Sequence, residues 1–274
     1  MSSYFRAGAK KYFLFRDAIA RATGVKPPDL PKPLPVISIP QFTLAESTSL
    51  WNNLPAPISS ERPKSMEELG QAYGYILYRT HVADPGKGVL TINALHDYAN
   101  VYVNQQPVGQ LDRRLKQDRL EIAIPSGRAT LDILVENLGR INFGPHLQDD
   151  RKGILGSVTL DGRELTGWQI YTLPMSDLSG LKPWKAERTA APAFCRGTFA
   201  LTDVGDTFLD VQNLGMGIVW VNGHNLGRVW DIGPQRSLFL PAPWLHTGAN
   251  EVIVFDSTTL TSPILRGLTQ PIWN

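Results

Sequence analysis

Aromatic and hydrogen-bonding side chains gather in the last quarter of the chain, where their types suit the binding of a sugar. Trp244 lies a short distance along the chain from Trp220 and Trp230, with amide, imidazole and guanidinium groups between them. An aromatic ring can stack on the apolar face of a pyranose while such polar groups bond its hydroxyls. The residues that we predict to bind carbohydrate are Trp220, Asn222, His224, Asn225, Arg228 and Trp230. Tryptophans in β-rich domains also fill cores and interfaces, and that alternative stays open.

Other patterns that could do chemistry are weak. The histidines never show a metal-ligand pair at i, i+4; they are His81, His96, His146, His224 and His246. Asp149 and Asp150 could ligate a cation, but such a pair more often belongs to a solvated loop. No G-x-S-x-G elbow surrounds the candidate nucleophiles Ser176, Ser179 and Ser237. Glu136 and Glu251 fall in β-like runs and are predicted to be scaffold carboxylates. We therefore predict no catalytic residue, no metal site and no cofactor.

Composition excludes several classes of protein. The chain has 274 residues and a formal net charge of +2 that is spread along its length, which argues against a nucleic-acid surface. No apolar run approaches the ~20 residues of a membrane span, so a soluble protein is expected. The first residues, "MSSYFRAGAKKYFLF", do not predict a signal peptide, and the compartment is left open. Cys195 cannot form an internal disulfide, because it is the single cysteine, and its strand-like context predicts a small buried hydrophobe.

The candidate sugar-binding residues belong to a phrase that the chain contains twice. "GIVWVNGHNLGRVWD" at residues 217 to 231 matches "ANVYVNQQPVGQLDR" at residues 99 to 113, and Val101 and Val219 lie 118 residues apart. Asn222 and Gly223 predict a tight hairpin turn, whereas "QQP" gives the first copy a different turn chemistry. Gly109 and Gly227 would permit a bulge or a close backbone approach. The flanks also agree: "YILYRT" lies over "AFCRGT", and "LDILVEN" matches "NEVIVFD" after a one-residue shift. A repeat of this length predicts two related domains.

Most of the remaining sequence reads as short β-strands bounded by turn residues. We predict an all-β fold of two β-sandwiches of jelly-roll type, over residues 41–175 and 176–274. Residues 1–40 precede them: an amphipathic helix from Lys10 to Ala22, with apolar residues Tyr12, Phe15 and Ile19, then the proline-rich strap "KPPDLPKPLPVISIP". "SMEE" at residues 65–68 has the spacing of a capping box and predicts a helical turn.

Several long motifs, in order along nearly the whole chain, resemble one enzyme family. "GMGIVWVNGHNLGRVWDIGPQRSLFLPAPWLHTGANEVIVFD" is similar to the C-terminal β-sandwich of the glycoside hydrolase family 35 β-galactosidases. "ERPKSMEELGQAYGYILYRT", "VENLGRINFG" and "KGILGSVTLDGRELTGWQIYTLPM" resemble the preceding sandwich of these enzymes, whose fold is called galactose-binding-like. The strap and "KYFLFRDAI" resemble the exit from their catalytic (β/α)8 barrel.

The resemblance implies a function for the chain as part of a larger enzyme. Retaining glycosidases use two carboxyl groups about 5–5.5 Å apart, and the family motifs that carry its glutamates have no counterpart here. We expect an accessory C-terminal portion of a β-galactosidase, which hydrolyses terminal β-galactosides, inactive by itself and partnered by the barrel. An independent carbohydrate-binding module that takes galactosides, and an adaptor or homodimerisation piece, are the alternatives. No nucleic-acid or membrane partner is predicted.

Overall fold

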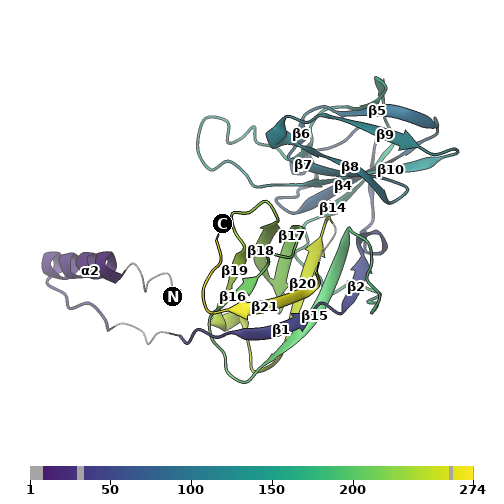
Figure 1. Ribbon diagram of the computed structural model, residues 1–274. Helices are drawn as coiled ribbons and strands as arrows, with labels where there is room; N and C mark the ends of the chain where they lie inside the picture. The colour runs from purple at the N-terminus through teal and green to yellow at the C-terminus, as the bar shows by residue number, and fades with distance from the viewer. Residues whose placement is uncertain (1–8, 30–33, 259–261, 274) are drawn as a thin grey trace. The chain divides into compact units, whose positions relative to one another are not determined.

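The computed structural model describes residues 9–29, 34–258 and 262–273 (Figure 1). It contains two compact units: Trp51–Gly180, here called the first sandwich, and the described residues up to Leu50 together with those from Leu181 onward, whose β-strands form the second sandwich. The named strands pair antiparallel, which confirms the predicted all-β architecture. Residues 1–8, part of the stretch that does not predict a signal peptide, and residues 30–33 of the strap lie outside the described residues.

The first sandwich packs two main sheets over one core. Its six-stranded sheet runs, in spatial order, β3 (Ile58–Ser60), β14 (Trp168–Leu173), β4 (Tyr75–Val82), β10 (Ala129–Glu136), β7 (Tyr98–Val103) and β8 (Gln106–Asp112). The opposite sheet contains β13 (Arg163–Glu164), β12 (Val158–Leu160), β5 (Gly86–Ile92) and β9 (Arg119–Ile124), and β6 (Leu95–His96) pairs with β11 (Gly153–Ile154). Alternate residues point inward, so Ile76 and Ile133 of one sheet meet Leu90 of the other in the buried core. Two short turns of helix, η2 (Glu67–Leu69) and η3 (Arg113–Leu115), lie in its connections.

The second sandwich has the same construction. One sheet runs β1 (Ile39–Thr43), β21 (Ile264–Leu268), β16 (Thr207–Asp210) and β19 (Ser237–Leu240). The other runs β18 (His224–Trp230), β17 (Met216–Val221), β20 (Gly248–Asp256), β15 (Ala193–Leu201) and β2 (Glu46–Ser49). The helical turn η4 (Ala242–Trp244) belongs to this sandwich, whereas η1 (Leu50–Asn52) spans the chain boundary between the two units. Val219, Val254 and Leu209 are buried between the two sheets. Cys195 lies in this core, as predicted, and burial raises the pKa of its thiol to about 11.

The boundary between the sandwiches differs from the expected one at residue 41. Ile39 pairs with Gly267, and Glu46 pairs with Arg196, so β1 and β2 belong to the second sandwich. The chain therefore supplies an edge strand to each sheet of the second sandwich before it builds the first. Sequence patterns report local structure, whereas these pairings join residues about 150 to 230 positions apart, and the linear order of the strands gave no signal of them.

The predicted N-terminal helix is confirmed as α2 (Ala9–Thr23). Gly24 ends it with a φ of +67°, and its N–H donates to the Ala20 carbonyl at 2.9 Å, a glycine cap. Phe15 and Ile19 are 58% and 62% exposed, so the described residues leave much of the apolar face of α2 uncovered. Further along, the Ile37 N–H donates to the Asp206 carbonyl at 2.9 Å and ties the end of the strap to the second sandwich.

The repeated phrase forms equivalent hairpins in the two sandwiches. Each hairpin has a register shift at the same place, next to the pair Val101 and Gly109 in the first copy and next to Val219 and Gly227 in the second. The predicted glycine bulge is thereby confirmed. Both turns have two residues at positive φ, although Gln105 occupies the position of Gly223, so different residues adopt one conformation.

The flanking strands correspond with different offsets from those the sequence suggested. Leu131 pairs with Val103 and Val252 pairs with Val221, so Leu131 corresponds to Val252, two positions beyond the predicted match. Through these strands Thr80 corresponds to Gly197 rather than to Thr198. Loops of different length between the strands change the offset without changing the sheet, and a constant shift of 118 is therefore wrong outside the hairpin.

Candidate functional site

The six residues predicted to bind carbohydrate lie on the β17–β18 hairpin and its turn. Trp220 is 3% exposed and pairs across the hairpin with Asn225. His224 and Asn225 are exposed, whereas Asn222, Arg228 and Trp230 are half-buried. The structure therefore brings these residues together on one hairpin but does not present them as one exposed surface.

Asn222 is held by hydrogen bonds of its own fold. Its Nδ2 donates to the Trp244 carbonyl and to Asn250 Oδ1, both at 2.8 Å, and its Oδ1 accepts from the Glu251 N–H at 2.9 Å. Its φ is +49°, a left-handed conformation that asparagine tolerates well. Asn104 makes the equivalent bond to the Thr130 N–H at 2.8 Å in the first sandwich. The shared asparagine thus ties the hairpin turn to the neighbouring strand.

The aromatic rings of this region have protein groups against them. The His224 imidazole stacks on Trp244 with ring centroids 4.8 Å apart and planes 14° from parallel. The Arg228 guanidinium lies 4.3 Å from the centre of the Trp230 ring. A pyranose that stacked on either of these ring faces would have to displace its present neighbour.

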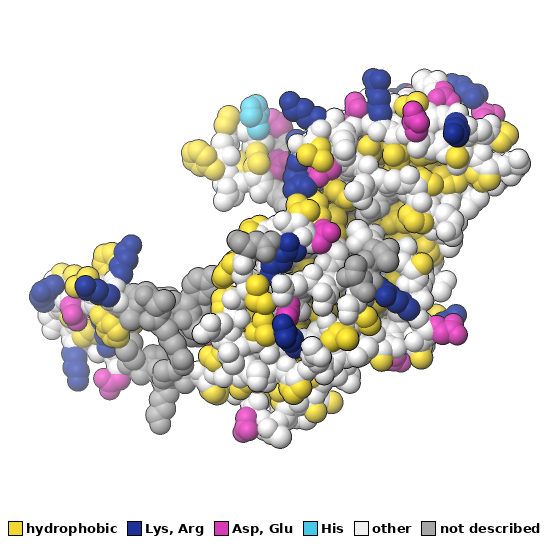
Figure 2. Space-filling model, viewed as in Figure 1, with side chains coloured by type: hydrophobic (Ala, Val, Ile, Leu, Met, Phe, Trp, Pro, Cys, Tyr) yellow, Lys and Arg dark blue, Asp and Glu magenta, His cyan; other side chains and the backbone are white. Residues whose placement is uncertain are grey.

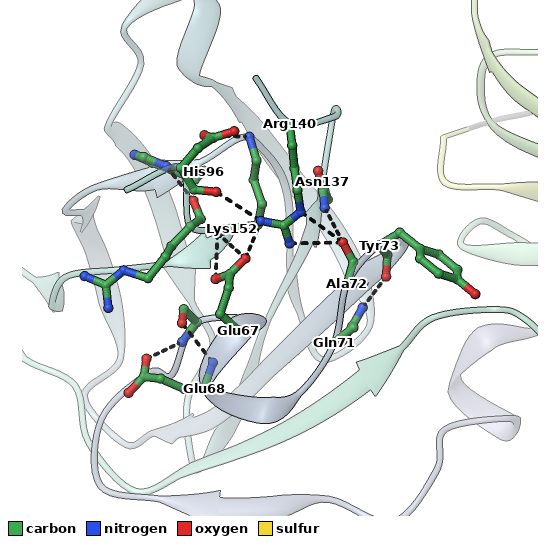
Figure 3. A network of polar contacts seen from close by, with 12 residues as sticks. Glu67, Glu68, Gln71, Ala72, Tyr73, His96, Asn137, Arg140 and Lys152 are labelled. Atoms are coloured by element: carbon green, nitrogen blue, oxygen red, sulfur yellow. Dashed lines mark hydrogen bonds and ion pairs between the residues drawn. The ribbon is translucent and has the colours of Figure 1, made fainter. Parts of the chain in front are cut away.

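A network of charged side chains in the first sandwich was not foreseen from the sequence (Figure 3). At its centre Lys152 has a side chain only 4% exposed, and its Nζ lies 2.8 Å from Asp97 Oδ2 and 3.2 Å from Asp150 Oδ1. Arg113 binds the other oxygen of Asp97 at 2.8 Å. A buried ammonium flanked by two carboxylates is stable only while the partners remain charged and close.

Glu67 joins this network because of the predicted capping box. The Ser65 N–H donates to Glu68 Oε2 at 2.8 Å and the Glu68 N–H donates to Ser65 Oγ at 3.2 Å, which confirms the reciprocal pair. The turn that follows, η2, places Glu67 against the backbone N–H of Lys152, which donates to its Oε2 at 3.0 Å. A local capping signal therefore positions a carboxylate against a residue 85 positions away.

Arg140 connects the network to the segment 138–151, here called the braced loop, which runs from β10 to β11. Its Nη1 lies 2.6 Å from Glu67 Oε1 and donates to the Asp150 carbonyl at 3.0 Å, while Nε and Nη2 donate to the Ala72 carbonyl at 3.2 and 3.0 Å. Asp150 accepts from the Ile141 N–H at 2.9 Å. These contacts tie both ends of the braced loop to each other and to the body of the sandwich, as Figure 3 shows around Arg140.

The network also shifts the acidities of its carboxyl groups. Burial raises the pKa of Glu67, but the hydrogen bonds from Lys152 and Arg140 outweigh it and leave the pKa below its ordinary value. Asp150 behaves in the same way. Burial raises its pKa, but the Ile141 N–H and the Lys152 ammonium lower it by more, so the pKa lies below its ordinary value. Both groups are thus held in the charged form that the network needs.

The remaining candidate groups are dispersed through the fold. Glu136 accepts a hydrogen bond from the Tyr75 hydroxyl at 2.7 Å in the first sandwich, and Glu251 lies 3.7 Å from Arg196 in the second. Asp149 is exposed and contacts His146 at 3.4 Å. Among the described residues, no three histidine, cysteine or acidic side chains gather as metal ligands would, and none of the helices there is long and apolar enough to cross a membrane.

Comparison with known proteins assigns both sandwiches to one family. Residues 63–174 match the family model of the first all-β domain of β-galactosidase, and residues 192–250 match that of its galactose-binding domain. Together the two matches cover more than half of the chain.

Full-length relatives agree with this assignment. The chain is 50% identical over 230 residues to a β-galactosidase of Xanthomonas manihotis, a match that covers 84% of the chain and 38% of the relative. It is 38% identical over 272 residues to the human β-galactosidase-1-like protein 2, and 35% identical over 305 residues to β-galactosidase 1 of Dictyostelium discoideum; these matches cover 93% and 97% of the chain, and 42% and 45% of the relatives. The chain thus spans less than half the length of these relatives. It belongs to the β-galactosidase family and is homologous to the non-catalytic all-β portion of its members.

Proposed function

We propose that this chain is the accessory portion of a β-galactosidase, which supports a catalytic domain and does not hydrolyse β-galactosides by itself. The observation that carries the proposal is the extent of the match: the chain aligns with 38% to 45% of each relative, and its two matched regions are an all-β domain and a galactose-binding domain. The catalytic partner is the (β/α)8 barrel that the resemblance implies, carried on the same protein or on another chain.

The surroundings of the glutamates support an accessory, non-catalytic role for this chain. A retaining glycosidase needs two of them about 5–5.5 Å apart around the glycosidic bond. Glu136 and Glu251, the glutamates of the two equivalent strands β10 and β20, each have a partner within their own sandwich: Glu136 accepts from the Tyr75 hydroxyl, and Glu251 lies 3.7 Å from Arg196. Such contacts suit a structural role better than proton transfer to a sugar.

The exposed face of α2 supports a partner of this kind. Phe15 and Ile19 lie four residues apart, on one side of the helix, and both are more than half exposed. We propose that this face packs against the catalytic domain, because burial of each side chain would contribute about 1.5–3 kcal/mol.

The test is hydrolysis of a chromogenic β-galactoside by the purified chain, alone and mixed with the part of the Xanthomonas manihotis β-galactosidase that lies outside the matched region. We expect no hydrolysis by the chain alone and a rate on mixing that exceeds that of the isolated catalytic part. Replacing Phe15 and Ile19 together by serine should weaken the effect of mixing. Hydrolysis by the chain alone would refute the accessory role.

Binding of a galactoside at the β17–β18 hairpin is a separate proposal with less structural support, because Trp230 and Trp244 already stack with Arg228 and His224. Titration of the chain with galactose by calorimetry tests it, with Trp230→Ala as the variant. Binding that Trp230→Ala abolishes would support the proposal. Absence of measurable heat at millimolar galactose would remove it.

A further inference from the structure

The braced loop carries large apolar side chains into solvent. Phe143 is 90% exposed, Leu147 49% and Ile141 46%. Figure 2 shows hydrophobic atoms at the outer end of the braced loop, which Figure 1 shows extending from the first sandwich beside β6 and β7. Single exposed apolar residues are ordinary, but three within seven residues of one loop form a patch of the kind that marks an interaction site.

The base of the braced loop is fixed before any partner arrives. Arg140 and Asp150 close it, through the bond from Arg140 Nη1 to the Asp150 carbonyl at 3.0 Å and that from the Ile141 N–H to Asp150 Oδ2 at 2.9 Å. The same two residues reach Glu67 and the buried Lys152 of the sandwich. Because the ordering of a loop costs free energy on association, a loop that is already ordered at its base binds more tightly than a free one.

We propose that the apolar tip of the braced loop, formed by Ile141, Phe143 and Leu147, docks on the catalytic domain. This inference rests on the proposed function, and it adds a second contact surface, on the first sandwich, to the face of α2. The length of chain outside the match favours this occupant, since more than half of each relative lies beyond the aligned region.

The size of the tip argues against a second copy of this chain as the occupant. A stable complex between separate proteins buries about 800 Å² on each partner, whereas an aromatic side chain buries roughly 150–250 Å². Three side chains on one loop are therefore too few to hold a dimer together. They suffice as one contact of a domain that other parts of the chain also hold.

The experiment titrates the chain into a fixed amount of the Xanthomonas manihotis catalytic part and records the concentration that gives half of the maximal gain in β-galactoside hydrolysis. The variants are Phe143→Ser and Leu147→Ser. The control is Leu115→Ser, which removes a side chain that is 66% exposed in the same sandwich but outside the braced loop. Thermal unfolding of each variant verifies that it folds as the wild type does.

We expect Phe143→Ser to raise the half-maximal concentration about 30-fold, the effect of losing a central interface residue. Leu147→Ser should raise it less, and Leu115→Ser should leave it unchanged. If the wild type enhances hydrolysis and Phe143→Ser equals it, the docking role is wrong while the accessory function stands. If the wild type has no effect on the catalytic part, both are wrong. A dimer in gel filtration that Phe143→Ser dissociates would instead identify a second copy as the occupant and overturn the inference.

Discussion

Replacing Lys152 by methionine should destabilise the first sandwich by about 3–5 kcal/mol, the cost of breaking a buried ion pair from one side. Methionine keeps most of the length of the lysine side chain but removes the charge that lies 2.8 Å from Asp97 and 3.2 Å from Asp150. Asp97 is 8% exposed and would keep one cationic partner, Arg113. That remaining contact places the expected loss toward the lower end of the range.

Urea denaturation followed by hydrogen exchange and mass spectrometry measures this loss. Peptides from Trp51–Gly180 report the first sandwich separately from the second, so a change confined to them locates the effect. Arg151→Met is the matched control, because it removes a positive charge from the exposed neighbouring residue. It should change the free energy of unfolding by no more than about 0.5 kcal/mol.

A second substitution separates the loss of charge pairing from a loss of packing. Asp97→Asn introduced with Lys152→Met removes one of the two carboxylates that the lysine neutralises, and should restore part of the lost stability. A loss below about 1 kcal/mol in Lys152→Met would refute the account of a buried ion pair. So would a double variant whose loss equals the sum of the two single losses.

Three further predictions concern the β17–β18 hairpin, the pH dependence of stability and the reactivity of the Cys195 thiol. Asn222→Ala should lower the free energy of unfolding of the second sandwich by about 2–4 kcal/mol in urea denaturation, because side-chain hydrogen bonds are lost and alanine tolerates a positive φ poorly. A change below about 0.5 kcal/mol would contradict the structural role of Asn222. The pKa of Glu67 is lowered in the folded state. The charged Glu67 side chain therefore stabilises the fold fully above pH 4.5, the ordinary pKa of the group, and this stabilisation is lost as pH falls through the lowered pKa. The free energy of unfolding, measured from pH 6 to pH 3, should therefore depend less on pH in Glu67→Gln than in the wild type. The same slope against pH in both proteins would refute this. Cys195, with its pKa raised to about 11, should react with a thiol reagent at pH 8 far more slowly in the folded chain than in urea, and equal rates would show that it is accessible.

The fold was largely predictable because its signals are local. Ile76, Tyr78 and Val82 alternate along "YILYRTHV" and point into the core, and this local run of β-branched and aromatic residues was enough to predict β4. The capping box at Ser65 and the glycine end of α2 were likewise readable, since each is complete within a few residues. The pairing of β1 and β2 with the second sandwich was not readable, because a strand pattern does not name its neighbour.

The arginines of the two sandwiches illustrate the same limit. Thr80 corresponds to Gly197 in the sheets, so Arg79 corresponds to Arg196, whereas the offset of 118 aligns Arg196 with Tyr78. Each arginine lies over aromatic rings of its own unit: Arg79 is 5.5 Å from the ring centre of Tyr171, and Arg196 is 4.3 Å from that of Trp184. Only the strand register reveals this equivalence, because a one-residue error exchanges the two faces of a strand.

The candidate sites, like the fold, combine features that the sequence shows with features that only the tertiary structure shows. By itself the sequence determined the class of fold, the repeated hairpin with its glycine bulge and the resemblance to the β-galactosidase family, all of which depend on residues close together in the chain. Tertiary structure alone decided that Asn222 bonds to its own fold, and that Glu67, Asp97 and Lys152 meet in one charged network beneath the braced loop. The physical reason is that burial and electrostatic partnership arise between strands distant in sequence, and no periodicity along the chain encodes which distant charges will meet.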